Sequence, residues 1–149
     1  MLRIYFDCCA INRPLDDQRH AHIAAEAGAV RQLLLLVRWK RVCWVGAPIL
    51  RVELQACADE ERKAILLSML DDLCAEQRIV IGQTDGMLAS LLALHLSLPD
   101  AVHVVSASRI GADIFITCDR QLLKMGGRIK SLTRLAVMSP LQAVAELSL

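Results

Sequence analysis

The sequence opens on Leu2-Arg3-Ile4-Tyr5-Phe6-Asp7, a short apolar run that ends on a carboxylate. A run of this length and composition is typical of a buried strand, so we expect a first strand over residues 2–6. A carboxylate is costly to bury without a partner, which makes Asp7 a candidate for a functional role. The same arrangement recurs later in the chain, where Ile114-Phe115-Ile116-Thr117-Cys118 is followed directly by Asp119.

Strand-like runs alternate with helical patterns along the whole chain. Further strands are expected over residues 42–45, 78–81, 114–118 and 135–138. Helices are expected over residues 23–37 and from near Pro48, Asp59, Thr84, Pro99 and Ser139 onward. This alternation predicts a parallel sheet covered by helices on both faces, a three-layer α/β/α fold. Since no repeat or linker interrupts the pattern, we expect a single domain over residues 1–149.

The composition favours a folded domain over a disordered or membrane-spanning chain. Of 149 residues, 55% are hydrophobic and 22% charged, and the mean hydropathy is +0.42. The densest apolar run, Leu33–Val37, is bounded by Arg31 and Arg38 and falls well short of the roughly 20 residues that span a bilayer. Arg3 and Asp7 interrupt the N-terminal apolar stretch, so we expect neither a secretory signal nor a membrane association.

The net charge and the cysteines bear on the possible binding partners and on the cellular compartment. The net charge of +1 carries no overall signature of nucleic-acid binding, although a basic groove can exist on a near-neutral chain. The six cysteines form no CxxC pair and no Cys/His set with zinc spacing. Free cysteines in apolar segments behave as small hydrophobic residues. The pattern therefore predicts a protein of the reducing cytoplasm.

Acidic residues stand where strands are expected to end or helices to begin. They are Asp7, Glu53, Asp100 and Asp119. Ligands of open α/β sheets bind beyond the carboxyl ends of the strands, and a doubly wound sheet can bring such residues together. Converging carboxylates repel one another unless a cation neutralises them, and oxygen ligands suit Mg²⁺ or Mn²⁺. Taken one at a time, Asp100 and Asp119 are more typical of helix N-caps, and Glu53 is more typical of a solvated helix face.

Local motifs reinforce the first interpretation. They are Ile4–Asp7 followed by Asn12–Gln18, then Pro48–Glu53, Pro99–His103 and Ala112–Asp119. These segments resemble the corresponding segments of PIN-domain nucleases, in the order of that family and over nearly the whole chain.

The resemblance implies a three-layer α/β/α fold, a Mg²⁺ or Mn²⁺ site and cleavage of single-stranded RNA. Many small bacterial members are VapC-like toxins, held inactive by a cognate antitoxin and often dimeric, so it also implies an antitoxin partner and a homodimer. Carried over by position, the metal-binding and catalytic acids are Asp7, Glu53, Asp100 and Asp119. Thr117 and Asn12 become supporting polar residues.

The sequence departs from the family pattern at two places. Cys8 and Cys9 follow Asp7, where a hydroxyl residue often follows, and no fifth acid is evident directly after Asp119. Two other classes stay open. One is a catalytically silent PIN-like interaction module, and the other is a phosphoryl-accepting α/β switch, which usually needs a second acid beside the first strand's aspartate.

Two arginines near the Asp7 loop are candidate substrate-binding residues. Arg13 and Arg19 could bind RNA phosphate or the acidic tail of an antitoxin, but Asp16 and Asp17 could equally pair with them.

An aromatic residue among cations and two histidines also have two interpretations each. Trp39 with Lys40 and Arg41 could stack on a base or simply form an amphipathic helix end. His103 could orient a ligand, but a satisfied core position is the commoner role for such a histidine, and the same holds for His95.

Overall fold

The computed structural model describes residues 1–147 of the chain. The strands are β1 (Arg3–Phe6), β2 (Cys43–Gly46), β3 (Cys74–Glu76), β4 (Ile114–Ile116) and β5 (Ala136–Met138). The helices are α1 (Cys8–Asn12), α2 (Ala21–Arg38), α3 (Pro48–Gln55), α4 (Glu60–Leu73), α5 (Gly86–Ala93), α6 (Leu98–Arg109), α7 (Arg120–Lys124), α8 (Gly126–Thr133) and α9 (Pro140–Glu146), with a 3₁₀ turn η1 (Arg13–Leu15) between α1 and α2.

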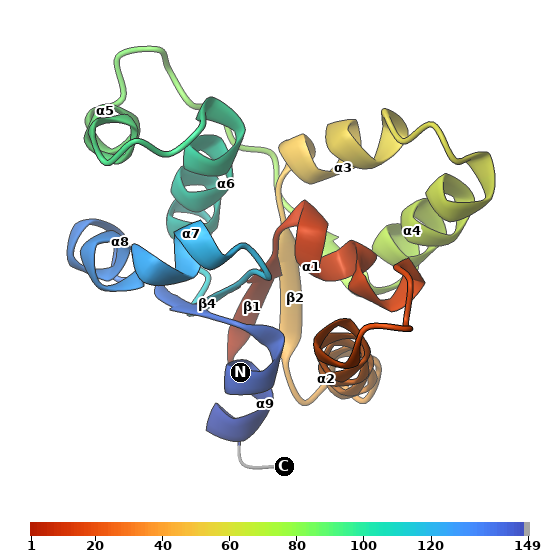
Figure 1. The fold of residues 1–149 in the computed structure, drawn as a ribbon. Helices are drawn as coiled ribbons and strands as arrows, with labels where there is room; N and C mark the ends of the chain where they lie inside the picture. Colours follow the sequence, from red (N-terminus) through yellow and green to blue (C-terminus); the bar gives the residue numbers. More distant parts are fainter. Residues whose placement is uncertain (148–149) are drawn as a thin grey trace.

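The strands form one parallel sheet in the order β3-β2-β1-β4-β5. Ile4 of β1 is in register with Trp44 of β2 on one side and with Ile114 of β4 on the other. The chain builds from β1 to one edge of the sheet and then returns to build the other half from β4 (Figure 1). The point where the strand order reverses therefore lies beside β1, and such a point leaves a crevice at the carboxyl ends of the strands.

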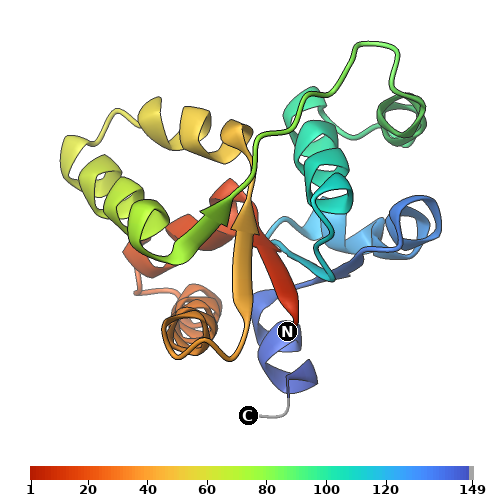
Figure 2. The ribbon, with the colours of Figure 1, turned by 180° about the vertical axis from the view of Figure 1, so that it is seen from behind.

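Helices cover both faces of the sheet, which confirms the predicted three-layer α/β/α fold (Figures 1 and 2). Successive residues of a strand point to opposite faces, so Phe6 packs in the core shared with α2 and α4, whereas Tyr5 packs in the core shared with α5, α6 and α8. Both side chains are fully buried. Burial on both faces explains why the central strands are continuously apolar in the sequence.

The strand predicted over residues 78–81 is wrong, because the edge strand β3 lies at Cys74–Glu76, directly after α4. It pairs with β2 on one side only, and Glu76 is exposed. An edge strand needs little apolar surface, so hydrophobicity does not mark it. The apolar run after it has no strand pairing: Val80 is 95% exposed, while Ile79 and Ile81 pack against the α5–α6 side of the core.

Most predicted helix starts agree with the structure to within a few residues. Asp59 caps α4 by accepting a hydrogen bond from Arg62 N, as expected. The helix expected from Thr84 begins at Gly86 after an Asp85 cap. The short helix α1, which follows β1 at once, was not expected from the sequence.

The longest helix, α2, presents a buried face and an exposed face. Leu33 on the buried face is fully buried among residues of the sheet and of α4, whereas Leu35 is 45% exposed. Within residues 1–147, no helix combines the length and apolar character that crossing a bilayer requires.

These two leucines make a matched test of the α2 packing. We expect Leu33→Ala to lower the free energy of unfolding by about 2–5 kcal/mol, because it leaves a cavity in a close-packed core. Leu35→Ala should stay within about 0.5 kcal/mol of the wild type. Urea denaturation followed by circular dichroism measures both, and equal losses for the two variants would contradict this packing of α2.

Candidate functional site

A cleft of about 440 Å³ opens at the carboxyl ends of β1 and β4. It is lined by Asp7, Cys8, Cys9, Asn12, Asp16, Glu53, Arg62, Asp100, His103 and Asp119. The four predicted acids, which are far apart in the sequence, all line it. Its lining carries five carboxyl groups and one guanidinium, an excess of negative charge that favours a bound cation.

Asp7 and Asp119 both lie beyond the ends of central strands, Asp7 directly after β1 and Asp119 three residues after the last residue of β4. Each follows its strand and is the N-cap of the next helix, α1 for Asp7 and α7 for Asp119. Asp119 Oδ1 accepts hydrogen bonds from Gln121 N at 2.8 Å and Leu122 N at 3.3 Å. The helix-cap interpretation of Asp119 is therefore confirmed, and the same residue also faces the cleft.

Glu53 and Asp100 reach the cleft from helices on opposite faces of the sheet. Glu53 lies in the second half of α3, with a side chain that is 33% exposed. Asp100 lies within the first turn of α6, whose N-cap is Ser97; Asp100 N donates to Ser97 Oγ at 3.2 Å. The interpretation of Asp100 as an N-cap is thus wrong, because the cap comes three residues earlier.

Asp7 is the most enclosed of the acids, at 4% exposed. Its Oδ1 accepts hydrogen bonds from Ala10 N at 3.0 Å and from Cys9 Sγ at 3.1 Å, and its Oδ2 accepts one from Thr117 Oγ1 at 2.5 Å. Burial, with a smaller contribution from Cys9, raises the pKa of Asp7 well above its usual value. Thr117 Oγ1 also accepts a hydrogen bond from Asp119 N at 3.0 Å, so this threonine lies between two of the acids.

Glu53 is held by a buried chain of hydrogen bonds that ends on the sheet. His103 Nε2 contacts Glu53 Oε1, and the Tyr5 hydroxyl lies 2.7 Å from His103 Nδ1. A carboxylate can only accept, so His103 Nε2 donates to Glu53, and Nδ1 is left to pair with the Tyr5 hydroxyl. His103 is 2% exposed, which confirms the core interpretation, yet it also lines the cleft. His95 is exposed, so the core interpretation of that residue is wrong.

The sequence did not indicate that Arg62 and Asp16 line the cleft. Arg62 Nη1 donates to Asp16 Oδ1 at 2.9 Å and to Asn12 Oδ1 at 3.1 Å, and its Nη2 donates to Leu15 O at 2.6 Å. These bonds hold η1 against the start of α4 and place a fifth carboxyl group in the cleft wall. No local motif marks this contact, because it depends on how α4 packs against η1.

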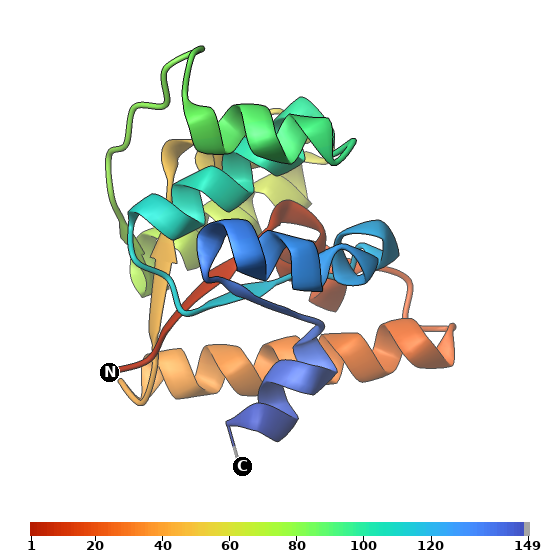
Figure 3. The same ribbon diagram turned by 90° about the vertical axis from the view of Figure 1, so that its left-hand side faces the viewer.

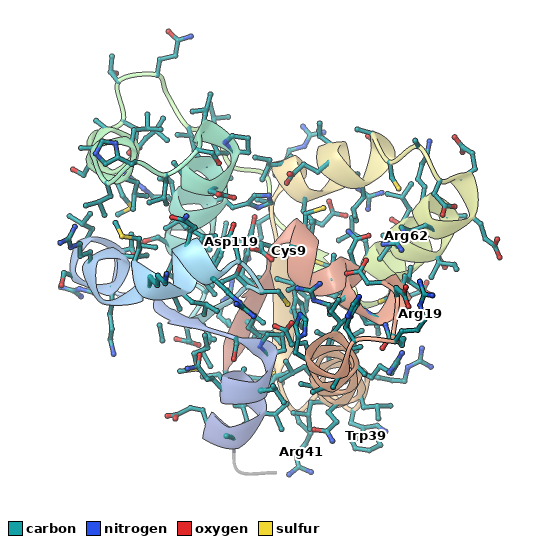
Figure 4. The ribbon with its side chains drawn as sticks, viewed as in Figure 1. Cys9, Arg19, Trp39, Arg41, Arg62 and Asp119 are labelled. Carbon is teal, nitrogen blue, oxygen red and sulfur yellow. The ribbon has the colours of Figure 1, made fainter. Side chains whose placement is uncertain are left out.

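Arg13 and Arg19 do not line the cleft. Arg13 lies 3.2 Å from Asp16 Oδ2 and 3.3 Å from Glu26 Oε1, and Arg19 lies 2.5 Å from Asp17 Oδ2 with a side chain that is 88% exposed. Figure 4 shows Arg19 well away from Asp119 and Cys9. In the structure, Arg13 therefore pairs with Asp16, and Arg19 pairs with Asp17. A role for either arginine in RNA binding stays a prediction.

The cleft thiols are poor nucleophiles. Burial and the nearby Glu53 and Asp7 raise the pKa of Cys8 to about 12. Contact with Cys118 and burial raise the pKa of Cys9 as well. Since the thiolate is the reactive form, the carboxyl groups are better candidates than these thiols for a chemical role in the cleft.

The donor atoms of the cleft suit a hard cation by type, but they are not gathered into a ligand set. Carboxylate and amide oxygens are the ligands that Mg²⁺ and Mn²⁺ prefer. In the described part of the chain, no three or more His, Cys, Asp or Glu side chains are grouped so that they could hold a metal ion. Both oxygens of Asp7 bond to protein donors, and Glu53 bonds to His103. Metal binding would therefore require these carboxyl groups to move toward one another.

Comparison of the chain with protein-family models, curated proteins and solved structures gave no significant match. The resemblance to PIN-domain nucleases thus depends on the motifs described above and stays a prediction.

The environment of Asp7 predicts a pH-dependent stability in metal-free solution. Its pKa is raised in the folded state, so the stability that the protonated group allows is present at low pH and is lost as the pH rises through the folded-state pKa. Each pKa unit between the two states is worth about 1.4 kcal/mol. We expect Asp7→Asn to remove this loss and to be more stable than the wild type at neutral pH.

Urea denaturation with EDTA at several pH values measures the effect. Asp17→Asn, at an exposed ion pair outside the cleft, is the matched control and should keep the wild-type dependence. A wild-type protein that gains stability between mildly acidic and neutral pH, with Asp7→Asn less stable throughout, would show that Asp7 is charged and stabilising in the folded chain.

Proposed function

We propose that this protein is a Mg²⁺- or Mn²⁺-dependent ribonuclease that cleaves single-stranded RNA in the acidic cleft. The observation that carries the proposal is that Asp7, Glu53, Asp100 and Asp119, from four separate segments, line one cavity at the switch point of a parallel sheet. The motif resemblance supports the same activity. It also suggests that the protein is the toxin of a toxin–antitoxin pair, with an antitoxin partner and a homodimeric state.

The four acids would hold the cation, which when bound neutralises phosphate charge and activates water. The chain itself supplies orientation. Asp7 is fixed by hydrogen bonds from Ala10 N and from the Thr117 hydroxyl, and that hydroxyl in turn accepts a hydrogen bond from the backbone N–H of Asp119. A carboxylate of this set would orient the attacking water or accept its proton.

Two further groups of contacts shape the walls of the cleft. The bond from His103 holds Glu53 toward the cavity, and Tyr5 fixes the ring of His103. On the same side of the sheet as Glu53, Arg62 keeps Asn12 and Asp16 in the cleft wall. We place this activity in the reducing cytoplasm, since all six cysteines are unpaired thiols.

One observation favours a second candidate function, the catalytically silent interaction module. In the described residues the acids do not form a ready-made metal site, which is what such a module would show. The phosphoryl-accepting switch has less support, because Asp7 is 4% exposed and both its oxygens accept hydrogen bonds from the protein. Metal binding separates the first two possibilities.

The direct test is cleavage of single-stranded RNA by the purified protein with Mg²⁺ or Mn²⁺. We expect cleavage that EDTA abolishes and that Asp7→Asn reduces by about a hundredfold or more, since the variant removes a charged oxygen from the set that positions the cation. Asp17→Asn changes an exposed aspartate outside the cleft in the same way and should cleave like the wild type.

Calorimetric titration with Mn²⁺ completes the test. Saturable binding that is lost in Asp7→Asn and kept in Asp17→Asn is expected. If wild-type protein neither cleaves any RNA nor binds Mn²⁺, the nuclease proposal fails and the silent module is the better description.

A further inference from the structure

A second surface lies at the end of α2. Arg38, Trp39, Lys40 and Arg41 are consecutive and all exposed, and Trp39 is 64% exposed. Trp39 is the C-cap of α2, and Lys40 follows in the left-handed conformation, with φ at 57°. This turn ends the helix and leaves an indole and three cations together in solvent. We call these four residues the Arg38–Arg41 segment.

The segment belongs to a stretch of one charge sign. Residues 27–52 contain no Asp or Glu, whereas they contain the cations Arg31, Arg38, Lys40, Arg41 and Arg51. Arg51 is paired with Asp71 and Glu76. In the ion pairs formed by residues 1–147, none of the other four cations takes part. Their charge is therefore available to a partner, even though the net charge of the chain is close to zero.

A cavity of about 620 Å³ adjoins the segment, and Arg38 and Lys40 form part of its lining together with Trp44. The lining includes one carboxyl group, from Asp72. This cavity lies where the chain enters β2, at the amino-terminal edge of the sheet and thus opposite the acidic cleft. Figure 4 shows Trp39 and Arg41 projecting from the margin of the molecule below α2, away from Asp119.

Helix α2 connects the two sites. It has 18 residues and so spans about 27 Å, and Figure 3 shows it running the depth of the molecule, with its end near the N-terminus. Arg31 lies two turns before Arg38 and is exposed on the same side of the helix. Its Nη2 donates to Pro14 O at 3.3 Å in η1, next to the cleft residues Asn12 and Asp16. Arg31 thus places one exposed cation on α2 between the Arg38–Arg41 segment and the η1 side of the cleft.

We propose that the Arg38–Arg41 segment is a second contact site for the RNA substrate, which runs along α2 from the acidic cleft and stacks a base on Trp39. Exposed aromatic faces among unpaired cations are the features that bind single-stranded nucleic acid without sequence preference. An acidic peptide matches the cations but makes less use of the indole face. The site rests on the proposed function only in that the substrate is RNA.

Binding is measured without cleavage, by fluorescence anisotropy of a labelled uridine oligonucleotide longer than about 27 Å, with wild-type protein in EDTA. Trp39→Ala should weaken binding about fivefold to a hundredfold, as expected for the loss of one stacked base. Lys40→Gly should lower the salt dependence of log affinity by about 0.7. Glycine suits the left-handed conformation at this position, so weaker binding by this variant cannot be attributed to unfolding.

The matched control is Arg128→Ala, which removes an exposed cation from α8 on the other face of the sheet. It should bind like the wild type. Unchanged affinity and salt dependence in both Trp39→Ala and Lys40→Gly would overturn the proposal, even if the protein cleaves RNA. If a polyglutamate peptide binds more tightly than RNA and depends on Trp39, the segment is a protein-binding site and the proposal fails.

Cleavage assays distinguish this inference from the proposed function. If the protein is a ribonuclease, Trp39→Ala should lower kcat/KM on the long oligonucleotide and leave a dinucleotide substrate unaffected, because the dinucleotide cannot reach the segment. RNA binding that depends on Trp39 in a protein that cleaves no RNA would keep the second site and exclude the nuclease activity.

Discussion

The hydrogen bond from Thr117 to Asp7 joins the ends of the two central strands, and much of the cleft depends on it. β1 and β4 are neighbours in the sheet although more than a hundred residues separate them in the sequence. Where they end, the threonine hydroxyl donates to one aspartate and accepts from the amide of the other, Asp119. The Oδ1 atoms of the same two aspartates cap α1 and α7, through hydrogen bonds from Ala10 N to Asp7 and from Gln121 N to Asp119. Strand pairing, helix initiation and the placement of the two acids are thus linked through Thr117 and the two aspartates.

Forming the cleft costs folding free energy. Its lining holds five carboxyl groups against Arg62, and the most enclosed of them, Asp7, has a raised pKa because it is buried. The free energy that this site costs is offset in the core, where apolar side chains such as Phe6 and Phe115 are fully buried on the two faces of the sheet. The cleft acids are nevertheless held in place by the fold, since Asp7 and Asp119 cap helices, Glu53 bonds to His103 and Asp16 pairs with Arg62.

Local sequence was enough to predict the central strands and the parallel three-layer fold, because strands buried on both faces are continuously apolar. β1 ends directly before Asp7 as predicted, whereas β4 ends at Ile116, two residues earlier than predicted. It was not enough for the edge. β3 pairs on one side only and carries exposed Glu76, so its sequence is less typical of a strand than the more apolar run around Val80, which forms no strand. In the cleft, acids at strand ends and helix starts could be selected from position and motif. Arg62 could not, because its role comes from a contact between α4 and η1 that no spacing in the sequence encodes.

The two walls of the cleft belong to different layers. α3 and η1 come from one face of the sheet, and α6 with its His103 from the other, each anchored in its own hydrophobic core. The hydrogen bond between His103 and Glu53 is a bridge across this seam. A ligand that draws the acids together must move elements of both layers. Its binding would therefore be coupled cooperatively to the packing of the whole domain. Conversely, a substitution that loosens the packing of either core far from the cleft would change the distance between its opposing walls.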